Sequence, residues 1–260
     1  MINKIVGDIF MFLKKKFGFI VTNDDYVVRD HQLYGKRMMP GVVFLDVVFR
    51  YVKSNGYDVS KLELKNVVFK EPIVTSEHLD RKVQVFIYED DDHYFINAQS
   101  IEFSNGKVCG NEWHDNFEAE LHECNETSEC RIDIESLEQG ANEIKDMDSC
   151  YEFCRKVGLV HYDFMKLLGK VYIANDYILA KVWLSDLGES VRTDFLMHPA
   201  FLDGSLSVPG ALGIDQEDID VASRRPYIPM FIGRFNVRRG LPKICYVYID
   251  KKMLEPIRLH

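Results

Sequence analysis

A histidine, a glycine and a proline at fixed offsets mark the segment of this sequence where acid–base chemistry is easiest to place. His31, Gly35 and Pro40 fit the pattern H-x3-G-x4-P, and Gly41 follows directly. Histidine is the residue whose ordinary pKa lies nearest to neutral pH, so a partly buried imidazole can serve as a general base. The segment therefore predicts an active-site loop that leads into a helix.

The elements that position this loop follow from the apolar pattern. Residues 40–53 begin with proline and glycine and are then apolar almost all round, which predicts a helix buried on most sides. Segments with strand character come next, separated by turn-forming residues, at 62–69, 82–88, 94–100 and 117–122. One central helix followed by a run of antiparallel strands is an α+β pattern.

The second half repeats this order in weaker form. Residues 123–147 are rich in Glu, Asp, Asn and Ser and are predicted to connect two halves. Beyond them we expect, in order, strands at 170–173 and 177–184, a helix at 199–206, and strands at 230–237 and 244–249. We therefore predict two related units side by side, at 1–128 and 147–260, joined by a linker at 129–146.

Composition limits the classes of function. At 260 residues and 47% hydrophobic content the chain can bury a sizeable core. Its net charge of −9 repels phosphate backbones, so we expect no nucleic-acid partner. Neither a membrane span nor a signal peptide is indicated, because lysines interrupt the apolar N-terminal stretch. We expect a cytoplasmic protein that does not bind membranes.

The cysteines and most histidines indicate no metal site. The six cysteines form no C-x-x-C pair and have no tight Cys/His spacing, so free thiols are expected. Five histidines lie in polar or strand contexts without partner spacing and receive no predicted role: His78, His93, His114, His122 and His260. His198, which precedes Pro199, is expected to shape a turn rather than to react.

Four stretches of this chain resemble the dehydratase domains of modular polyketide synthases. They run from Asp25 to Asp46, from Val68 to Ile73, from His198 to Ser207 and from Pro226 to Ile232, and the likeness spans about residues 20–250. The resemblance implies a double hotdog, in which two antiparallel sheets each wrap a central helix. It also implies, as one option, the trans-acyltransferase type of synthase.

The sequence departs from the family pattern in three places. The family usually has glutamine or histidine four residues after the catalytic aspartate, where this chain has Ser207. The family segment Gly-Leu-x-Tyr-Gly-Pro-x-Phe aligns with residues 158–165, so that His161 stands in place of the tyrosine. After residue 250 the family normally adds more strand, so either the second hotdog is shortened at its C-terminal end or the boundaries of this sequence cut it.

The resemblance implies two catalytic groups for removing water from a 3-hydroxyacyl thioester. His31 would take the C2 proton as base, and Asp203 would protonate the departing hydroxyl if an apolar pocket raises its pKa. An aspartate near a helix start is also a common cap, so both interpretations of Asp203 stay open. No metal or nucleotide cofactor is expected, because the acyl chain would be carried on the phosphopantetheine of an acyl carrier protein.

Six further residues are expected to contact or position the substrate. A backbone N–H near Gly41 or Val42 would stabilise the thioester oxygen, Gly35 would let the loop pass close to the acyl chain, and Pro40 would preset the helix start. Ser207 would lie behind Asp203. His161 is either a surface or packing residue or a substrate contact.

Two alternatives to dehydration remain. The same scaffold could shift a double bond or cyclise the acyl chain, or it could be a catalytically weak domain that only binds the carrier protein or dimerises. Other polyketide synthase domains and a second copy of the chain are further expected partners.

Overall fold

The computed structural model describes residues 12–90, 92–124, 131–212 and 228–254. These ranges exclude the predicted boundary at residue 128, and also Pro226 and Tyr227 of the fourth family-like stretch. No helix of the described ranges is long and apolar enough to cross a membrane.

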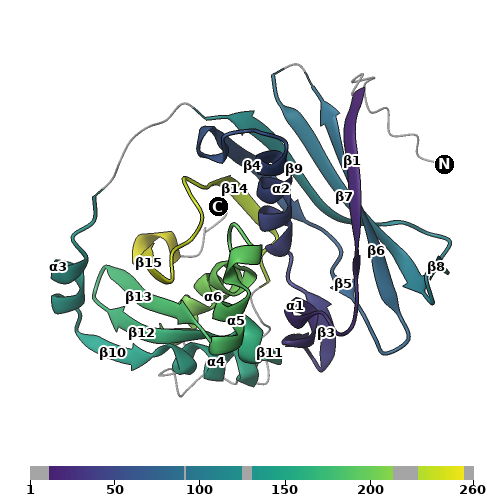
Figure 1. The fold of residues 1–260 in the computed structure, drawn as a ribbon. Coiled ribbons are helices and arrows are strands. Elements are labelled where there is room, and N and C mark those ends of the chain that lie inside the picture. Colours follow the sequence, from purple (N-terminus) through teal and green to yellow (C-terminus); the bar gives the residue numbers. More distant parts are fainter. Residues whose placement is uncertain (1–11, 91, 125–130, 213–227, 255–260) are drawn as a thin grey trace, which may run out of the picture.

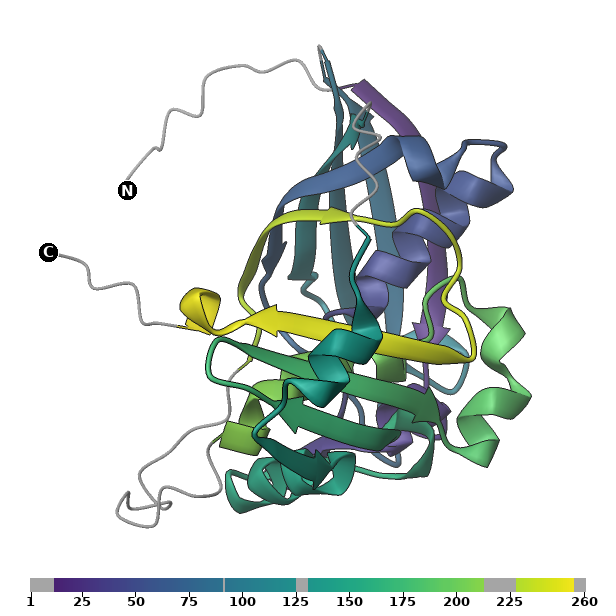
Figure 2. The same ribbon diagram turned by 90° about the vertical axis from the view of Figure 1, so that its left-hand side faces the viewer.

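A seven-stranded antiparallel sheet forms the upper part of the molecule (Figures 1 and 2). Its strands follow one another in space as β1–β6–β7–β9–β4–β14, with β8 paired to β7. They are β1 (Phe12–Val21), β4 (Leu62–Phe69), β6 (Asp80–Glu89), β7 (Tyr94–Ser104), β8 (Lys107–Val108), β9 (His114–Glu123) and β14 (Phe231–Asn236).

A second, four-stranded sheet forms the lower part and has the spatial order β10–β12–β13–β15. Its strands are β10 (Glu143–Asp146), β12 (Leu167–Ile173), β13 (Tyr177–Leu184) and β15 (Ile244–Asp250). A third, small sheet runs β11–β2–β3–β5 and consists of β2 (His31–Leu33), β3 (Lys36–Met39), β5 (Ile73–Val74) and β11 (Leu159–His161).

Six α-helices accompany these sheets. They are α1 (Tyr26–Arg29), α2 (Val43–Ser54), α3 (Ile134–Gln139), α4 (Met147–Lys156), α5 (Asp186–Ser190) and α6 (Pro199–Ser207). The main hydrophobic core lies between α2 and the seven-stranded sheet, and a second core joins α4 and α6 to the four-stranded sheet.

Helix α2 packs against the inner face of the first sheet through its apolar side chains. The rings of Phe44 and Phe117 stack with centroids 5.0 Å apart, and both side chains are almost completely buried. A buried carboxylate on the same helix, Asp46, accepts hydrogen bonds from the backbone N–H groups of Leu196 (2.9 Å) and Met197 (2.8 Å). Because Leu196 and Met197 lead into α6, Asp46 ties the two central helices together.

Two strands of the second half pair with strands of the first half. Strand β14 comes from the second half but pairs with β4 in the first sheet, and β11 pairs with β2. The predicted linker at 129–146 is also wrong in part, because residues 134–146 contain α3 and β10, and β10 pairs with β12. The polar composition of this segment reflects its exposure at a sheet edge rather than a lack of structure. The α+β class itself is confirmed.

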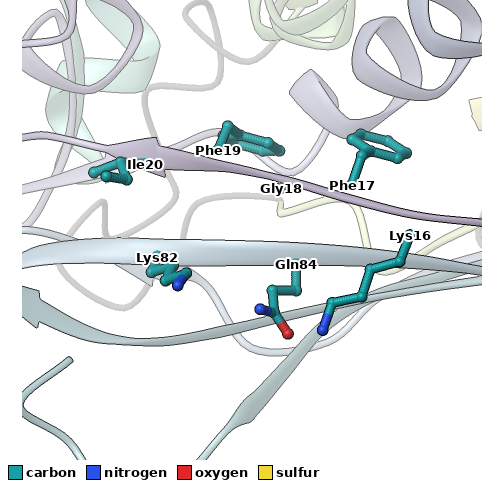
Figure 3. A pocket seen from close by; sticks show the side chains of 7 residues that line it. All are labelled: Lys16, Phe17, Gly18, Phe19, Ile20, Lys82 and Gln84. Carbon is teal, nitrogen blue, oxygen red and sulfur yellow. The ribbon is translucent and has the colours of Figure 1, made fainter. Parts of the chain in front are cut away.

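Strand β1, at the free edge of the first sheet, carries a shallow hollow shared with β6 (Figure 3). Gly18 lies at its centre, where a Cβ atom would come within 2.6 Å of the carbonyl oxygen of Val83. Lys16 and Gln84 point to one side of the strands and Phe17 to the other. Lysines on an edge strand discourage pairing with a further strand, and this hollow holds no acid–base pair.

Candidate active site

A cavity of about 1060 Å³ lies where the two halves meet. Both halves line it mainly with apolar side chains, among them Met38, Phe44, Phe69, Phe153, Leu206 and Met230. Two side chains that can exchange protons, His31 and Asp203, reach the cavity from opposite halves. A large apolar cavity with a few convergent polar groups is the usual form of a small-molecule site.

His31 is the first residue of β2, and the neighbouring strand fixes its tautomer. Its Nδ1 lies 3.0 Å from the carbonyl oxygen of Met38. Since a carbonyl only accepts, Nδ1–H donates and Nε2 keeps its lone pair. The His31 Nε2 atom lies 3.9 Å from Asp203 Oδ1. A free lone pair beside the cavity is what a general base requires.

Burial keeps the His31 ring neutral. Desolvation lowers the pKa of His31, and the nearby His161 ring lowers it further, while Asp203 acts in the opposite direction. The net direction is downward, as expected for a histidine that must be uncharged in order to accept a proton.

Asp203 lies inside α6 and does not cap it. The N-cap is His198, whose Nδ1 accepts a hydrogen bond from the Ala200 N–H at 3.2 Å. The predicted turn-shaping role of His198 is thereby confirmed, and the capping interpretation of Asp203 is wrong. Asp203 is 8% exposed, so its position in the helix serves to present the carboxyl group to the cavity.

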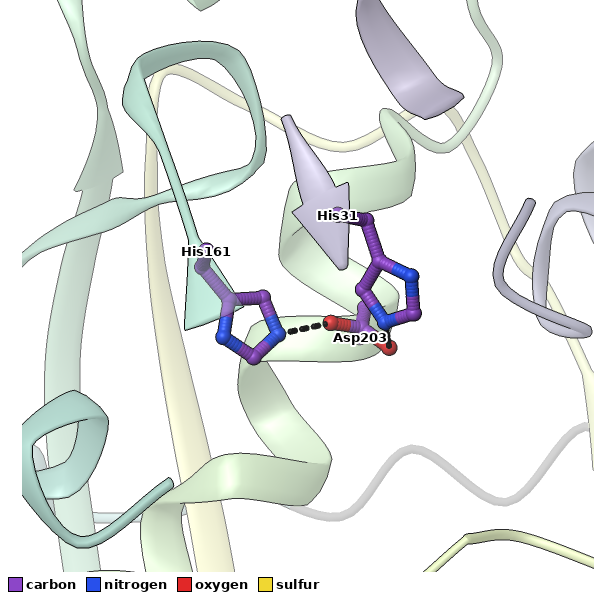
Figure 4. A group of neighbouring side chains, drawn as sticks. All are labelled: His31, His161 and Asp203. Carbon is purple, nitrogen blue, oxygen red and sulfur yellow. Dashed lines mark hydrogen bonds and ion pairs between the residues drawn. The ribbon is translucent and has the colours of Figure 1, made fainter. Parts of the chain in front are cut away.

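His161 lies directly behind the carboxyl group of Asp203 (Figure 4). Its Nε2 is 2.7 Å from Asp203 Oδ2, and the residue is 4% exposed. Strand pairing explains the position, because β11 pairs with β2 so that His161 stands opposite His31. The same pairing continues one residue further, since the carbonyl oxygen of Asp30 accepts from the Tyr162 N–H at 2.8 Å.

The surface option for His161 is wrong, whereas its packing role agrees with the structure, because its ring packs against those of Tyr151 and His31. It is not at the surface, and it is absent from the residues that line the cavity, so its contact is with Asp203. Its other ring nitrogen, Nδ1, is buried without a hydrogen-bond partner among the described residues. A carboxylate at Asp203 only accepts, so Nε2–H of His161 donates to it.

The expected rise in the pKa of Asp203 is not found. Burial raises its pKa, but the charges of His31 and His161 and the hydrogen bond from His161 outweigh burial, and the net direction is downward. Two histidines next to one carboxyl group therefore favour its ionised form. An apolar pocket by itself does not describe this environment.

Ser207 lines the cavity but is not the partner of the catalytic carboxyl group. Its hydroxyl forms a hydrogen bond with the thiol of Cys154, and burial is the main cause that raises the pKa of this thiol. The neighbouring thiol of Cys150 is also buried, and burial raises its pKa to about 12. Burial and a raised pKa make both cysteines inert, and the side-chain hydrogen bond to Asp203 comes from His161.

The loop and helix-start residues divide into two groups. Pro40 and Gly41 line the cavity, and a Cβ on Gly41 would lie 2.7 Å from the ring of Phe69, so only glycine fits there. Val42 is buried in the core and does not line the cavity. Gly35 also does not line it, so its expected contact with the acyl chain is wrong. With φ of 50° at Tyr34 and 75° at Gly35, these residues form the tight turn between β2 and β3.

His31, His161 and Asp203 are also a possible metal-ligand set. One donor atom from each lies within 4.8 Å of the others. Two imidazoles and a carboxylate are ligands that suit zinc. The same three side chains can therefore carry a proton relay or hold a cation.

Two family models match this chain. One, described as the polyketide synthase dehydratase domain, matches residues 18–103, and the other, described as the polyketide synthase dehydratase N-terminal domain, matches residues 133–254. Among curated proteins, the Bacillus subtilis polyketide synthases PksM and PksL are 26% and 24% identical over 86% and 98% of this chain. The chain spans only 5% of the length of either relative.

Solved structures show the same fold. An N-terminal dehydratase from the difficidin assembly line is 31% identical, with a TM-score of 0.83 over 92% of this chain and 79% of that one. A monomeric dehydratase domain from a trans-AT polyketide synthase split module is 22% identical, with a TM-score of 0.81 over 91% and 86%. The CurK dehydratase, solved as inactive His-to-Phe and Asp-to-Asn mutants, is 18% identical, with a TM-score of 0.76 over 90% and, respectively, 81% and 82%.

These similarities cover both halves of the chain and the two-sheet, two-helix architecture described above. The predicted double hotdog is therefore confirmed, and one of the structural neighbours comes from a trans-AT polyketide synthase. The chain belongs to the polyketide synthase dehydratase family.

Proposed function

We propose that this protein removes water from a 3-hydroxyacyl thioester that is carried on the phosphopantetheine arm of an acyl carrier protein. The observation that carries the proposal is the pair of His31 and Asp203 across an apolar cavity, with Nε2 and Oδ1 3.9 Å apart. The inactive histidine and aspartate mutants of the similarly folded CurK dehydratase support the use of these two residue types.

In the first half of the reaction, Nε2 of His31 takes the proton from C2 of the acyl chain. Burial has already lowered the pKa of His31, so the ring is neutral and its lone pair is available. As the C2–H bond breaks, negative charge develops on the thioester oxygen. A backbone N–H at Gly41, next to the cavity and just before α2, is suited to stabilise that charge.

In the second half, the C2–C3 double bond forms, the C3–O bond breaks, and the hydroxyl leaves as water with a proton from Asp203. Asp203 obtains that proton through its hydrogen bond with His161. Before the reaction, Asp203 and His161 must therefore hold together one proton more than a carboxylate and a neutral imidazole do. Afterwards the proton on His31 must return to the pair. His31 Nε2 and Asp203 Oδ1 are 3.9 Å apart, so a single group between them is enough to transfer this proton from His31 to Asp203.

Intact mass measurement of the carrier protein tests the proposal. We expect a 3-hydroxyacyl carrier-protein thioester to lose the mass of one water with the wild-type chain, and to stay unchanged with His31→Ala or Asp203→Asn. Retained carrier binding without any mass change would instead indicate a scaffold domain.

The double-bond isomerase requires a separate substrate. An enoyl thioester whose double bond moves without a change in mass would identify that activity and contradict dehydration as the main reaction. A cyclase would likewise leave the mass unchanged but would alter the fragmentation of the acyl chain. Homodimer formation and contacts with other synthase domains stay predictions that sedimentation of the purified chain can check.

A further inference from the structure

A second cluster of histidines and carboxylates lies on the polar outer face of the first sheet. It consists of His93, at the end of the β6–β7 turn, and of Glu120 and His122 on β9. One donor atom from each lies within 4.8 Å of the others. No role was predicted for His93 and His122 from the sequence, because their spacing along the chain matches no metal motif.

Strand register explains how the cluster forms. Tyr94 on β7 pairs with Leu121 on β9, so the preceding residue, His93, stands opposite His122. Glu120 lies two residues from His122 and therefore on the same face of the sheet. This face is the polar one, since the alternate residues of β9, such as Leu121, are buried in the core.

The distances within the cluster suit a small tetrahedral cation. His122 Nε2 lies 3.0 Å from Glu120 Oε2, and His93 Nε2 lies 3.6 Å from Asp90 Oδ2. Ligands at about 2.0–2.1 Å from a tetrahedral zinc ion are about 3.3 Å from one another. The separation between His122 and Glu120 is close to that value, and all three donor atoms of the cluster lie within 4.8 Å of one another, so side-chain adjustments would bring them into place.

The donor atoms are also oriented by outer hydrogen bonds. Nδ1 of His93 lies 2.9 Å from Asp92 Oδ1, so Nδ1–H donates to the carboxylate and the lone pair stays on Nε2. The amide of Asn66 donates to Glu120 Oε1 at 3.1 Å and leaves Oε2 toward His122. Carboxylate-oriented histidines and hydrogen-bonded carboxylates are typical partners around metal ligands.

Charge and ring stacking point in the same direction. The His93 and His122 rings stack with centroids 4.8 Å apart and an interplanar angle of 9°, and three carboxylates border them: Asp90, Asp92 and Glu120. Two imidazoles favour a transition metal over calcium or magnesium, which prefer oxygen ligands.

We propose that His93, Glu120 and His122 bind a divalent cation of the zinc type. The cation would tie the β6–β7 turn to β9 and so stabilise the first hotdog. This site is separate from the catalytic cavity, and the proposal does not depend on the dehydration reaction.

Zinc titration of the chelator-treated protein by calorimetry tests the proposal. We expect saturable binding in the wild type, and a dissociation constant raised by about 10–100-fold or more in His122→Ala, since even outer-shell changes have effects of that size. His93→Ala should behave in the same way and guards against a folding defect of one variant. The exposed His78 provides the matched control, and His78→Ala should bind zinc like the wild type.

The catalytic cluster must be tested in the same series, because it also presents three donor atoms. If His161→Phe abolishes zinc binding while His122→Ala and His93→Ala keep it, the cation binds in the cavity and the proposal is wrong. Absence of saturable binding in the wild type would overturn it equally. Thermal unfolding gives a second measurement. At a zinc concentration of one hundred times the wild-type dissociation constant, the wild-type midpoint should rise by about 5 °C and that of His122→Ala by about 3 °C or less.

Discussion

The two histidine–carboxylate clusters of this protein contain the same kinds of side chain in opposite surroundings. His31, His161 and Asp203 are each less than 10% exposed, beside an apolar cavity. His93 and His122 lie on the polar face of the first sheet, where Asp92 and Glu120 accept hydrogen bonds from them. Under the proposed function, burial rather than residue type is what makes an imidazole and a carboxyl group suited to acid–base catalysis.

If this comparison is correct, the largest effects come from the buried cluster. We expect His31→Ala and Asp203→Asn each to lower kcat for dehydration by about 10²–10⁴-fold, the usual contribution of a general acid or base. Single-turnover conversion of a 3-hydroxyacyl carrier-protein thioester measures this rate. His78→Ala, at an exposed position, serves as control and should keep the wild-type rate.

Substitution of His161 distinguishes the role of the Asp203 carboxylate from the role of the residue that hydrogen-bonds to it. Removing a hydrogen bond to a charged group costs about 1.5–3 kcal/mol, so His161→Phe should lower kcat by about 10–100-fold with little change in KM. The alkaline limb of the pH–rate profile should also move, because the variant removes the hydrogen bond between His161 and Asp203.

A rescue variant gives this prediction its control. In the family a glutamine four residues after the aspartate supports the carboxyl group, so Ser207→Gln in the His161→Phe background should restore part of kcat. The same change in the wild type should have little effect. If Ser207→Gln rescues nothing, and His161→Phe alters thermal stability without moving the pH profile, then His161 has only a packing role.

A third buried histidine tests burial without a neighbouring carboxylate. Desolvation lowers the pKa of His198 to about 4, compared with about 6.5 in an unfolded chain. The unfolded state therefore binds more protons between these values, and the stabilising contribution is complete above pH 6.5 and is lost as the pH falls toward 4. Between pH 7 and pH 5 the loss is about 2 kcal/mol.

Urea unfolding at pH 7 and pH 5 measures this effect. His198→Asn keeps a capping side chain at the start of α6 but has no titrating ring, so its free energy of unfolding should fall about 2 kcal/mol less than that of the wild type. Equal losses in both proteins would mean that His198 is protonated in the folded state at pH 5.

Much of the fold follows from local pattern. The predicted strands at 62–69 and 177–184 coincide with β4 and β13, and the predicted helix at 199–206 coincides with α6 to within one residue. Alternating or continuous apolar residues fix such elements because they are buried in the two cores. Strand β1 was not predicted, because its run of lysines hides the apolar alternation of an edge strand.

The parts of the site that escaped prediction depend on long-range pairing. His31 and Asp203 could be placed from their motifs, but the position of His161 depends on β11, a three-residue strand with no periodicity of its own. Its pairing with β2 joins residues from opposite halves. The same is true of His93 and His122, since only the register between β7 and β9 makes them neighbours. A signal existed for His161 alone, in its replacement of the family's tyrosine.

The smallest expected effect belongs to the half-buried surface cluster of His93, Glu120 and His122 without metal. Ion pairs and hydrogen bonds at the surface contribute little, because water competes for each partner and salt screens their charges, so His93→Ala should change the free energy of unfolding by about 0.5 kcal/mol or less in a chelator. Excess zinc should widen the gap between the variant and the wild type, since only the wild type gains binding energy on folding. A large destabilisation in the chelator would show instead that the stacked rings of His93 and His122 stabilise the sheet without metal. The contrast between a buried reactive cluster and a metal-binding cluster on the surface of the sheet would then be wrong.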